Sequence, residues 1–197
     1  MSETLADQQL FNFYDKAYRF SVENYKKDID WITNLKQSDM TAEKFFSEYV
    51  WVVLCSGFSV KGAQVISDKL RIKFDLNVIK HPLKRKAIKI GWDNYEIWWK
   101  HIKNLKTDEV KLEFLDTLPH IGGITKYHLG KNIGLNVAKP DVHLTRLADK
   151  YGFADVQFMC DTIGNHVGHE RRLVDQVLWK YCQIHPNYLN EMRNEVK

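Results

Sequence analysis

The chain has 197 residues, of which 44% are hydrophobic and 13% aromatic, so it can bury a sizeable core, and disorder over most of its length is excluded. Its formal net charge of +4 permits a nucleic-acid partner without requiring one. The longest apolar run, Tyr49 to Cys55, is far shorter than the roughly 20 residues that span a bilayer.

Hydrophobic spacing predicts helices along the whole chain. Apolar residues at three- and four-residue steps mark the first helix, on a face that includes Leu10, Tyr14, Ala17, Tyr18, Val22 and Tyr25. Thr41 and Ser59 are placed to cap the next two helices. Pro82 suits a first helical turn, and Asp93 is placed to cap a separate helix over 94–105.

Later helix starts are expected at Thr107, Asp155 and Pro186. The stretch 71–80 is the one segment that suits a short extended conformation. We find no internal repeat and no run with the alternation of a strand. The sequence therefore predicts an all-α fold of about ten short helices.

The most informative window begins at Leu118, between two predicted helices. Pro119 stops the first helix because it has no N–H to donate, and Gly122 with Gly123 opens backbone dihedrals that other residues avoid. The second helix is expected to start near Ile124. Such a turn presents backbone N–H groups to an anion, although tight two-glycine turns also occur for packing alone.

A second motif, "KPDVHLTRLADKYG", runs from Lys139 to Gly152. It contains Asp141, the single acidic residue between Thr117 and Arg146, a stretch with four basic residues and three histidines. A lone carboxylate in a basic, glycine-containing segment points to chemistry on an anion.

Together, "LPHIGG" and "PDVHLTRL" resemble the helix-hairpin-helix/Gly-Pro-Asp superfamily of DNA glycosylases, which includes endonuclease III. The upstream segment from Phe45 to Leu70 is similar to that family's first barrel helix, DNA-inserting loop and next helix. The resemblance extends from about residue 41 to about residue 182. It implies a two-lobed helical fold with the active site in the cleft between the lobes. Residues 41–136 would form the barrel lobe with the hairpin, and 1–40 with 137–197 the lobe that carries Asp141.

The resemblance implies that Asp141 is the catalytic residue. Cleavage of a base–sugar bond builds positive charge on the sugar, and a carboxylate near that charge stabilises it or activates a water. Asp141 also directly precedes a predicted helix, so it can serve as an N-cap, and the two roles are compatible. His143 is interpreted as structural or as a group that orients Asp141, beside the base pocket.

Bifunctional relatives carry a nucleophilic lysine two residues after the family's second hairpin glycine. Gly122 matches that glycine, so the position of the lysine is Ile124 in this chain. Without an amine there is no Schiff base by the usual route. Lys126 lies two residues further on and should face elsewhere, because two helical steps rotate a side chain by about 200°. Lyase chemistry through Lys126 stays open as an alternative.

The resemblance also assigns residues to DNA contact and to a base pocket. Phe58 aligns with the family's inserting side chain, although it can equally be a core residue under a helix turn. The helical spacing of Trp92, Trp98 and Trp99 favours core positions, and a place in the base pocket is the second interpretation. The assigned DNA contacts are His120, Gly122, Gly123, Thr125 and Lys126 in the hairpin and Phe58, Ser59 and Lys61 in the inserting loop; the candidate pocket residues are Trp92, Trp98, Trp99 and His143.

No cofactor is expected. Cys55, Cys160 and Cys182 are too few and too scattered for an iron–sulfur cluster, and we interpret them as buried thiols. The spacing of His166, His169 and Glu170 is weak evidence for a metal site. A monovalent cation at the hairpin carbonyls is implied by the resemblance alone.

The sequence thus predicts a monofunctional DNA glycosylase that flips a modified base out of duplex DNA and hydrolyses its glycosidic bond. A protein that binds DNA structure through the hairpin without catalysis is the alternative. We expect a monomer without a membrane partner, in the cytoplasm and with the nucleoid if the source is prokaryotic.

Overall fold

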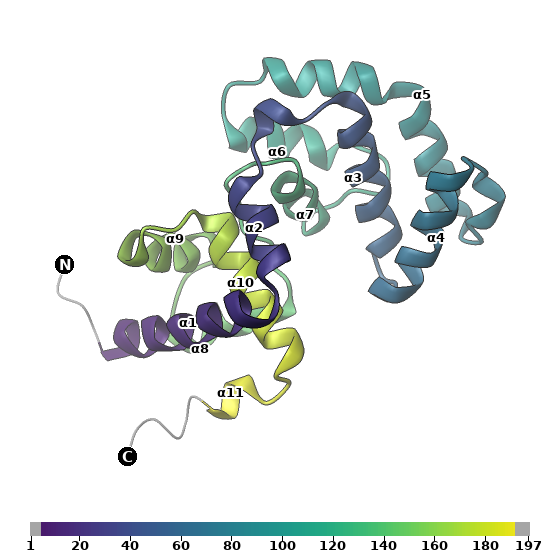
Figure 1. Cartoon of the computed structure of the whole chain (residues 1–197). Coiled ribbons are helices and arrows are strands. Elements are labelled where there is room, and N and C mark those ends of the chain that lie inside the picture. The colour runs from purple at the N-terminus through teal and green to yellow at the C-terminus, as the bar shows by residue number, and fades with distance from the viewer. Residues whose placement is uncertain (1–4, 192–197) are drawn as a thin grey trace. The chain divides into compact units, whose positions relative to one another are not determined.

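The computed structural model describes residues 5–191, and helices are the regular elements of that part (Figure 1). The chain folds into two compact units. One unit combines the chain up to Leu35 with the chain from Asn136 onward, and Lys36–Leu135 forms the other. Among the described residues, no helix has the length and apolar character needed to cross a membrane. The expected all-α class is confirmed, with eleven α-helices in this part of the chain.

The first unit is built around one central helix. Helix α10 packs against α1, α2, α8 and α9. Its residues are buried on nearly every side, as a helix at the centre of a bundle must be. The helices of this unit are α1 (Leu5–Asn24), α2 (Lys26–Asn34), α8 (Val142–Tyr151), α9 (Val156–Val167), α10 (Arg171–Ile184) and α11 (Tyr188–Glu191).

The predicted apolar face of α1 is correct except at its end. Leu10, Tyr14 and Ala17 are buried in the core of the first unit. In the last turn the buried stripe passes through Ser21, and Val22 is exposed. The buried position in the last turn of α1 is thus occupied by Ser21, whereas the spacing predicted Val22.

The second unit is centred on α3 (Ala42–Cys55), which packs against α4, α5 and α7. The Tyr49 hydroxyl lies 3.1 Å from the Ala87 carbonyl and 2.7 Å from the Pro119 carbonyl, and the two share its single O–H donor. It therefore ties α3 to α5 and to the turn that follows α6. The other elements are η1 (Gln37–Asp39), α4 (Val60–Ile72), η2 (Leu76–Val78), α5 (Pro82–Asn104), α6 (Asp108–Asp116) and α7 (Thr125–Asn132).

Most predicted helix starts are confirmed by hydrogen bonds. Thr41, Ser59, Thr107 and Asp155 each accept a backbone N–H of the first turn through the side chain. Pro82 occupies the first turn of α5.

Two expectations about local structure are wrong. Asp93 caps nothing, because α5 runs without a break from Pro82 to Asn104 and the Asp93 carboxylate pairs with Lys89 one turn earlier. The stretch 71–80 is not a strand: α4 continues to Ile72 and a 3₁₀ turn covers Leu76–Val78.

The thiols also differ from expectation at one position. Cys160 and Cys182 are buried as predicted, whereas Cys55, the last residue of α3, is half-buried.

Candidate functional site

The hairpin turn between α6 and α7 obtains its sharp bend from a histidine. His120 has φ of +65°, in the left-handed region that favours glycine. Gly122 and Gly123 have no such φ, so the expectation that these glycines supply the unusual dihedrals is wrong. Burial, with Lys84 and His81 nearby, lowers the pKa of His120, so its imidazole is neutral at neutral pH.

The two glycines instead leave open space over the turn. A Cβ added at Gly122 or at Gly123 would meet nothing within 4 Å. Thr125 closes the turn from inside: its hydroxyl accepts the Gly122 N–H at 2.8 Å. Within the described residues, no hydrogen bond engages the N–H of Gly123 or Ile124. The turn that leads into α7 therefore presents unpaired N–H donors with no side chain over them, which suits a phosphate.

Lys126 does not project from the hairpin as a free cation. Its ammonium donates to the Asp116 carboxylate of α6 at 2.9 Å, and this hydrogen bond raises its pKa. Ile124, at the N-cap of α7, is half exposed.

The loop at 56–61, which the resemblance predicts to insert into DNA, carries an exposed aromatic ring. The Phe58 side chain is 53% exposed, so the core interpretation of this residue is wrong. Ser59 is engaged as the cap of α4, where its hydroxyl accepts the Gly62 N–H at 3.2 Å, and Lys61 is exposed.

Three of the five basic residues between Lys80 and Lys89 bind the protein itself. Lys84 is buried and donates to backbone carbonyls. Arg85 donates to the Ile79 carbonyl through two nitrogens, and Lys89 pairs with Asp93. Lys80 and Lys86 are the two exposed members without such a bond among the described residues.

The three candidate pocket tryptophans pack against different neighbours. Trp99 is 3% exposed and stacks on Phe45 in the core, which removes it from contact with a base. Trp98 meets the Tyr49 ring edge-on. Trp92 is 46% exposed but stacks on Phe74 with ring centroids 4.4 Å apart.

In the first unit, Asp141 is the N-cap of α8. Its Oδ1 accepts the N–H of His143 at 2.9 Å and of Leu144 at 3.2 Å, so the capping interpretation is confirmed. No hydrogen bond occupies Oδ2 among the described residues. One carboxylate oxygen fixes the helix while the other is available for chemistry, and both interpretations of Asp141 remain compatible.

The segment that leads to Asp141 is held by α9 and α10. The Gln157 side-chain amide accepts the Ala138 N–H at 2.9 Å and donates to the Ala138 carbonyl at 2.5 Å. The buried carboxylate of Asp175 accepts the Lys139 N–H at 2.6 Å. The backbone position of Asp141 is therefore set by residues far away in sequence.

His143 has a partner that the sequence analysis missed. Its Nδ1 lies 3.3 Å from the Tyr188 hydroxyl. Tyr188 is buried, and burial raises the pKa of its hydroxyl, which therefore remains protonated. No local pattern singles out Tyr188, because the contact joins positions 45 residues apart. The interpretation of His143 as structural agrees with these contacts.

A second missed residue is Glu48 of α3. Burial raises the pKa of its carboxyl, and the Asn132 side chain donates to it at 2.8 Å. This hydrogen bond links α3 to the C-terminal end of α7, so it stabilises the second helix of the hairpin against α3.

The histidines considered for a metal site have other partners. His169 lies 2.8 Å from the Tyr14 hydroxyl, and the His166 ring stacks on Phe11 with centroids 3.9 Å apart. Within residues 5–191, no group of three His, Cys, Asp or Glu side chains is arranged to hold a metal ion.

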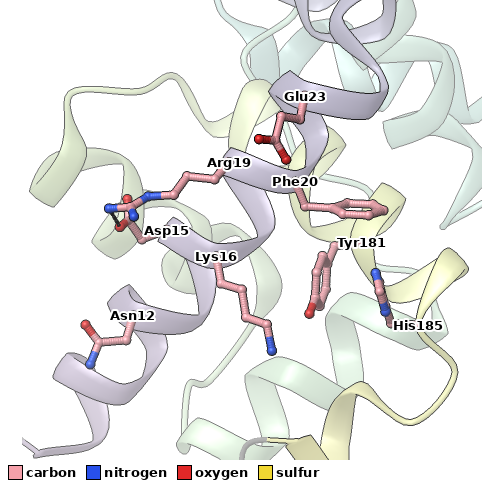
Figure 2. Close-up of a pocket in the computed structure, with 8 residues that line it drawn as sticks. All are labelled: Asn12, Asp15, Lys16, Arg19, Phe20, Glu23, Tyr181 and His185. Carbon is pink, nitrogen blue, oxygen red and sulfur yellow. Dashed lines mark hydrogen bonds and ion pairs between the residues drawn. The ribbon is translucent and has the colours of Figure 1, made fainter.

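One surface pocket of the first unit, of about 480 Å³, lies between α1 and α10. Figure 2 shows Lys16 and Phe20 of α1 beside Tyr181 of α10 and His185, the C-cap residue of that helix. The rings of Tyr181 and His185 stack with centroids 4.3 Å apart, so each ring covers one face of the other. The lining carries two cationic and two carboxylate side chains, and this balance favours no class of ligand.

No protein-family model matches the sequence, and no curated protein matches it. Among solved structures, the fold is similar to the crystal structure of Methanocaldococcus jannaschii 8-oxoguanine glycosylase/lyase in complex with 15mer DNA containing 8-oxoguanine. The TM-score is 0.67 at 20% sequence identity, over 84% of this chain and 94% of that one. The chain therefore has the helical fold of a DNA glycosylase, as the resemblance of its two motifs predicted.

Proposed function

We propose that this protein is a DNA glycosylase that hydrolyses the bond between a modified base and its sugar in duplex DNA. The observation that carries the proposal is the Asp141 carboxylate, held by one oxygen at the start of α8 with the other left for chemistry. The glycosylase fold around it supports the same reaction.

The second unit supplies features that suit a DNA backbone. It contains 17 Lys and Arg against 11 Asp and Glu, so its formal charge is +6, and the rest of the chain carries −2. The open glycine turn with the unpaired N–H groups of Gly123 and Ile124 is proposed to bind one phosphate. Exposed lysines such as Lys61, Lys80 and Lys86 would add sequence-tolerant contacts.

The proposed chemistry needs one carboxylate. As the base leaves, positive charge develops on the sugar, and Asp141 Oδ2 stabilises that charge or takes a proton from the attacking water. The water adds to the sugar carbon, the bond to the base breaks, and the base leaves with the bonding electrons and a proton. Enzymes that act on a base take it out of the stack, and exposed Phe58 is proposed to fill the gap. The proposal requires that one duplex contact both units.

We propose that strand cleavage by the usual lysine route is absent. Ile124 has no amine at the position of the nucleophilic lysine, and Lys126 is paired with Asp116. A protonated, carboxylate-bound amine is a poor nucleophile. The glycosylase/lyase activity named for the similar structure keeps cleavage through Lys126 as the second candidate.

We also propose that a monovalent cation binds the turn carbonyls of the hairpin. The turn from 117 to 124 contains no acidic side chain, and neutral carbonyl oxygens suit a singly charged hard cation. The carbonyls of Leu118, Pro119 and Gly122 already accept hydrogen bonds, so the backbone oxygens of His120, Ile121 and Gly123 would hold it. The cation would fix the turn, and no step of the reaction depends on it.

A panel of duplexes, each with one modified base, tests the function. The first member carries 8-oxoguanine, because that base is in the DNA of the similar structure. Each duplex is incubated with the protein and then heated in alkali, which cuts the strand wherever a base has been lost. Excision from one member supports the glycosylase, and binding to every member without excision supports the non-catalytic alternative.

A further inference from the structure

The ammonium group of Lys84 lies at the end of α3, below the inserting loop. Lys84 is 7% exposed although it belongs to the first turn of α5. Its Nζ donates to the carbonyls of Leu54, at 2.7 Å, and Ser56, at 2.6 Å. These carbonyls belong to the last turn and the C-cap of a helix, where carbonyls lack helical partners and favour a cation.

The same ammonium lies under the Phe58 ring. The distance from Nζ to the ring centroid is 5.4 Å, within the range of a cation–π contact. An ammonium has three N–H donors, and two of them are used by the carbonyls. Lys84 thus binds the backbone just before Phe58 and also contacts the Phe58 ring.

The Phe58 ring also lies against Gly62 in the first turn of α4. A Cβ added at Gly62 would come within 2.4 Å of Phe58 Cε1. The Phe58 ring can therefore lie here only because residue 62 is a glycine and has no side chain. It is 53% exposed and yet contacted by both α5 and α4.

We propose that Lys84 is a positioning residue that holds Phe58 in its inserting position before DNA arrives, with Gly62 leaving the space for the ring. This inference rests on the proposed function, because it assigns the purpose of the held ring to base flipping. A side chain already fixed in place loses less conformational freedom when it enters the duplex. Holding the loop thus lowers the cost of flipping a paired base.

Two variants test the inference against a matched control. Lys84→Met keeps most of the aliphatic stem and removes the ammonium. Gly62→Ala keeps a helical residue in α4 and displaces the ring, so it serves even where Lys84→Met folds poorly. Lys100→Met is the control, since Lys100 is an exposed lysine further along the same helix.

The first measurement is amide hydrogen exchange of a peptide that covers 55–59 in the full chain without DNA. Lys84→Met should accelerate exchange there, and Lys100→Met should leave it unchanged. Exchange in Lys84→Met equal to that of the wild type overturns the inference. This measurement does not depend on any glycosylase activity, so it separates failure of the inference from failure of the proposed function.

The second measurement is single-turnover excision from a paired lesion and from the same lesion in a single strand. Lys84→Met should slow excision from the paired lesion by about tenfold, the scale of one lost charged contact, and Gly62→Ala should slow it as well because its Cβ displaces the ring. Both should have little effect on the single strand. In a Phe58→Ala background, Lys84→Met should cause no further loss, because Lys84 acts through the ring. Equal losses on both substrates, or a further loss in the Phe58→Ala background, mean a general structural role and overturn the inference.

Discussion

The substitution Asp141→Asn should abolish base excision and leave the fold intact. Asparagine caps helices about as well as aspartate, so the bonds to the N–H groups of His143 and Leu144 are retained. What disappears is the negative charge, which is worth about 0.3–1 kcal/mol beside a helix N-terminus. For a chain of this size that free energy corresponds to a fall in Tm of at most about 4 °C.

The rate should fall by about 10²–10⁴-fold, because a neutral amide can neither take a proton from water nor balance the charge on the sugar. The assay is single-turnover excision from the duplex identified in the panel, beside thermal unfolding and DNA binding of the same preparation. Asp141→Ala is the matched variant: it should lose the same rate and, in addition, about 1 kcal/mol of stability with the cap. Excision by Asp141→Asn at a rate close to that of the wild type would refute the catalytic role.

Four further outcomes are expected. Duplex affinity should fall as salt rises, with a log–log slope of about −0.9 for each neutralised phosphate; a flat titration by fluorescence anisotropy contradicts DNA binding through the second unit. Gly123→Ala should leave Tm unchanged or slightly raised, because its Cβ meets nothing, while the dissociation constant for duplex DNA rises; unchanged affinity places the phosphate elsewhere. Phe58→Ala should slow excision from a paired lesion more than from an unpaired one, since unstacking costs a few kcal/mol only in the paired case; equal losses with a lower Tm would return Phe58 to a structural role. Borohydride should trap no protein–DNA adduct, because Ile124 has no amine and Lys126 is bound to Asp116; trapping that disappears in Lys126→Ala would establish the lyase.

The class of fold and most helix starts followed from the sequence by itself. Caps such as Thr41 and Ser59 act within three residues, so their hydrogen bonds are local events that a local pattern predicts. Asp141 at a helix start is the same kind of event. The predicted cap at Asp93 was wrong because a carboxylate is also common inside a helix, where it can pair with a lysine one turn away, as Asp93 does with Lys89.

The tertiary structure decided which side chains are available to a ligand. Lys84 and Lys126 look like free cations in the sequence, but one is buried against carbonyls and the other paired with Asp116, because α3 and α6 bring acceptors that are distant along the chain. Phe58 lies in the loop between α3 and α4 and Trp99 lies within α5, and packing leaves the first exposed and buries the second.

The site around Asp141 shows the same division. Its identity and its place at the start of α8 were determined by the sequence, because they depend on neighbouring residues alone. Its support by Gln157 and Asp175, and the contact of Tyr188 with His143, were decided by the tertiary structure. These hydrogen bonds form only when α9, α10 and α11 have packed around α8, and no spacing in the chain encodes such contacts at long sequence separation.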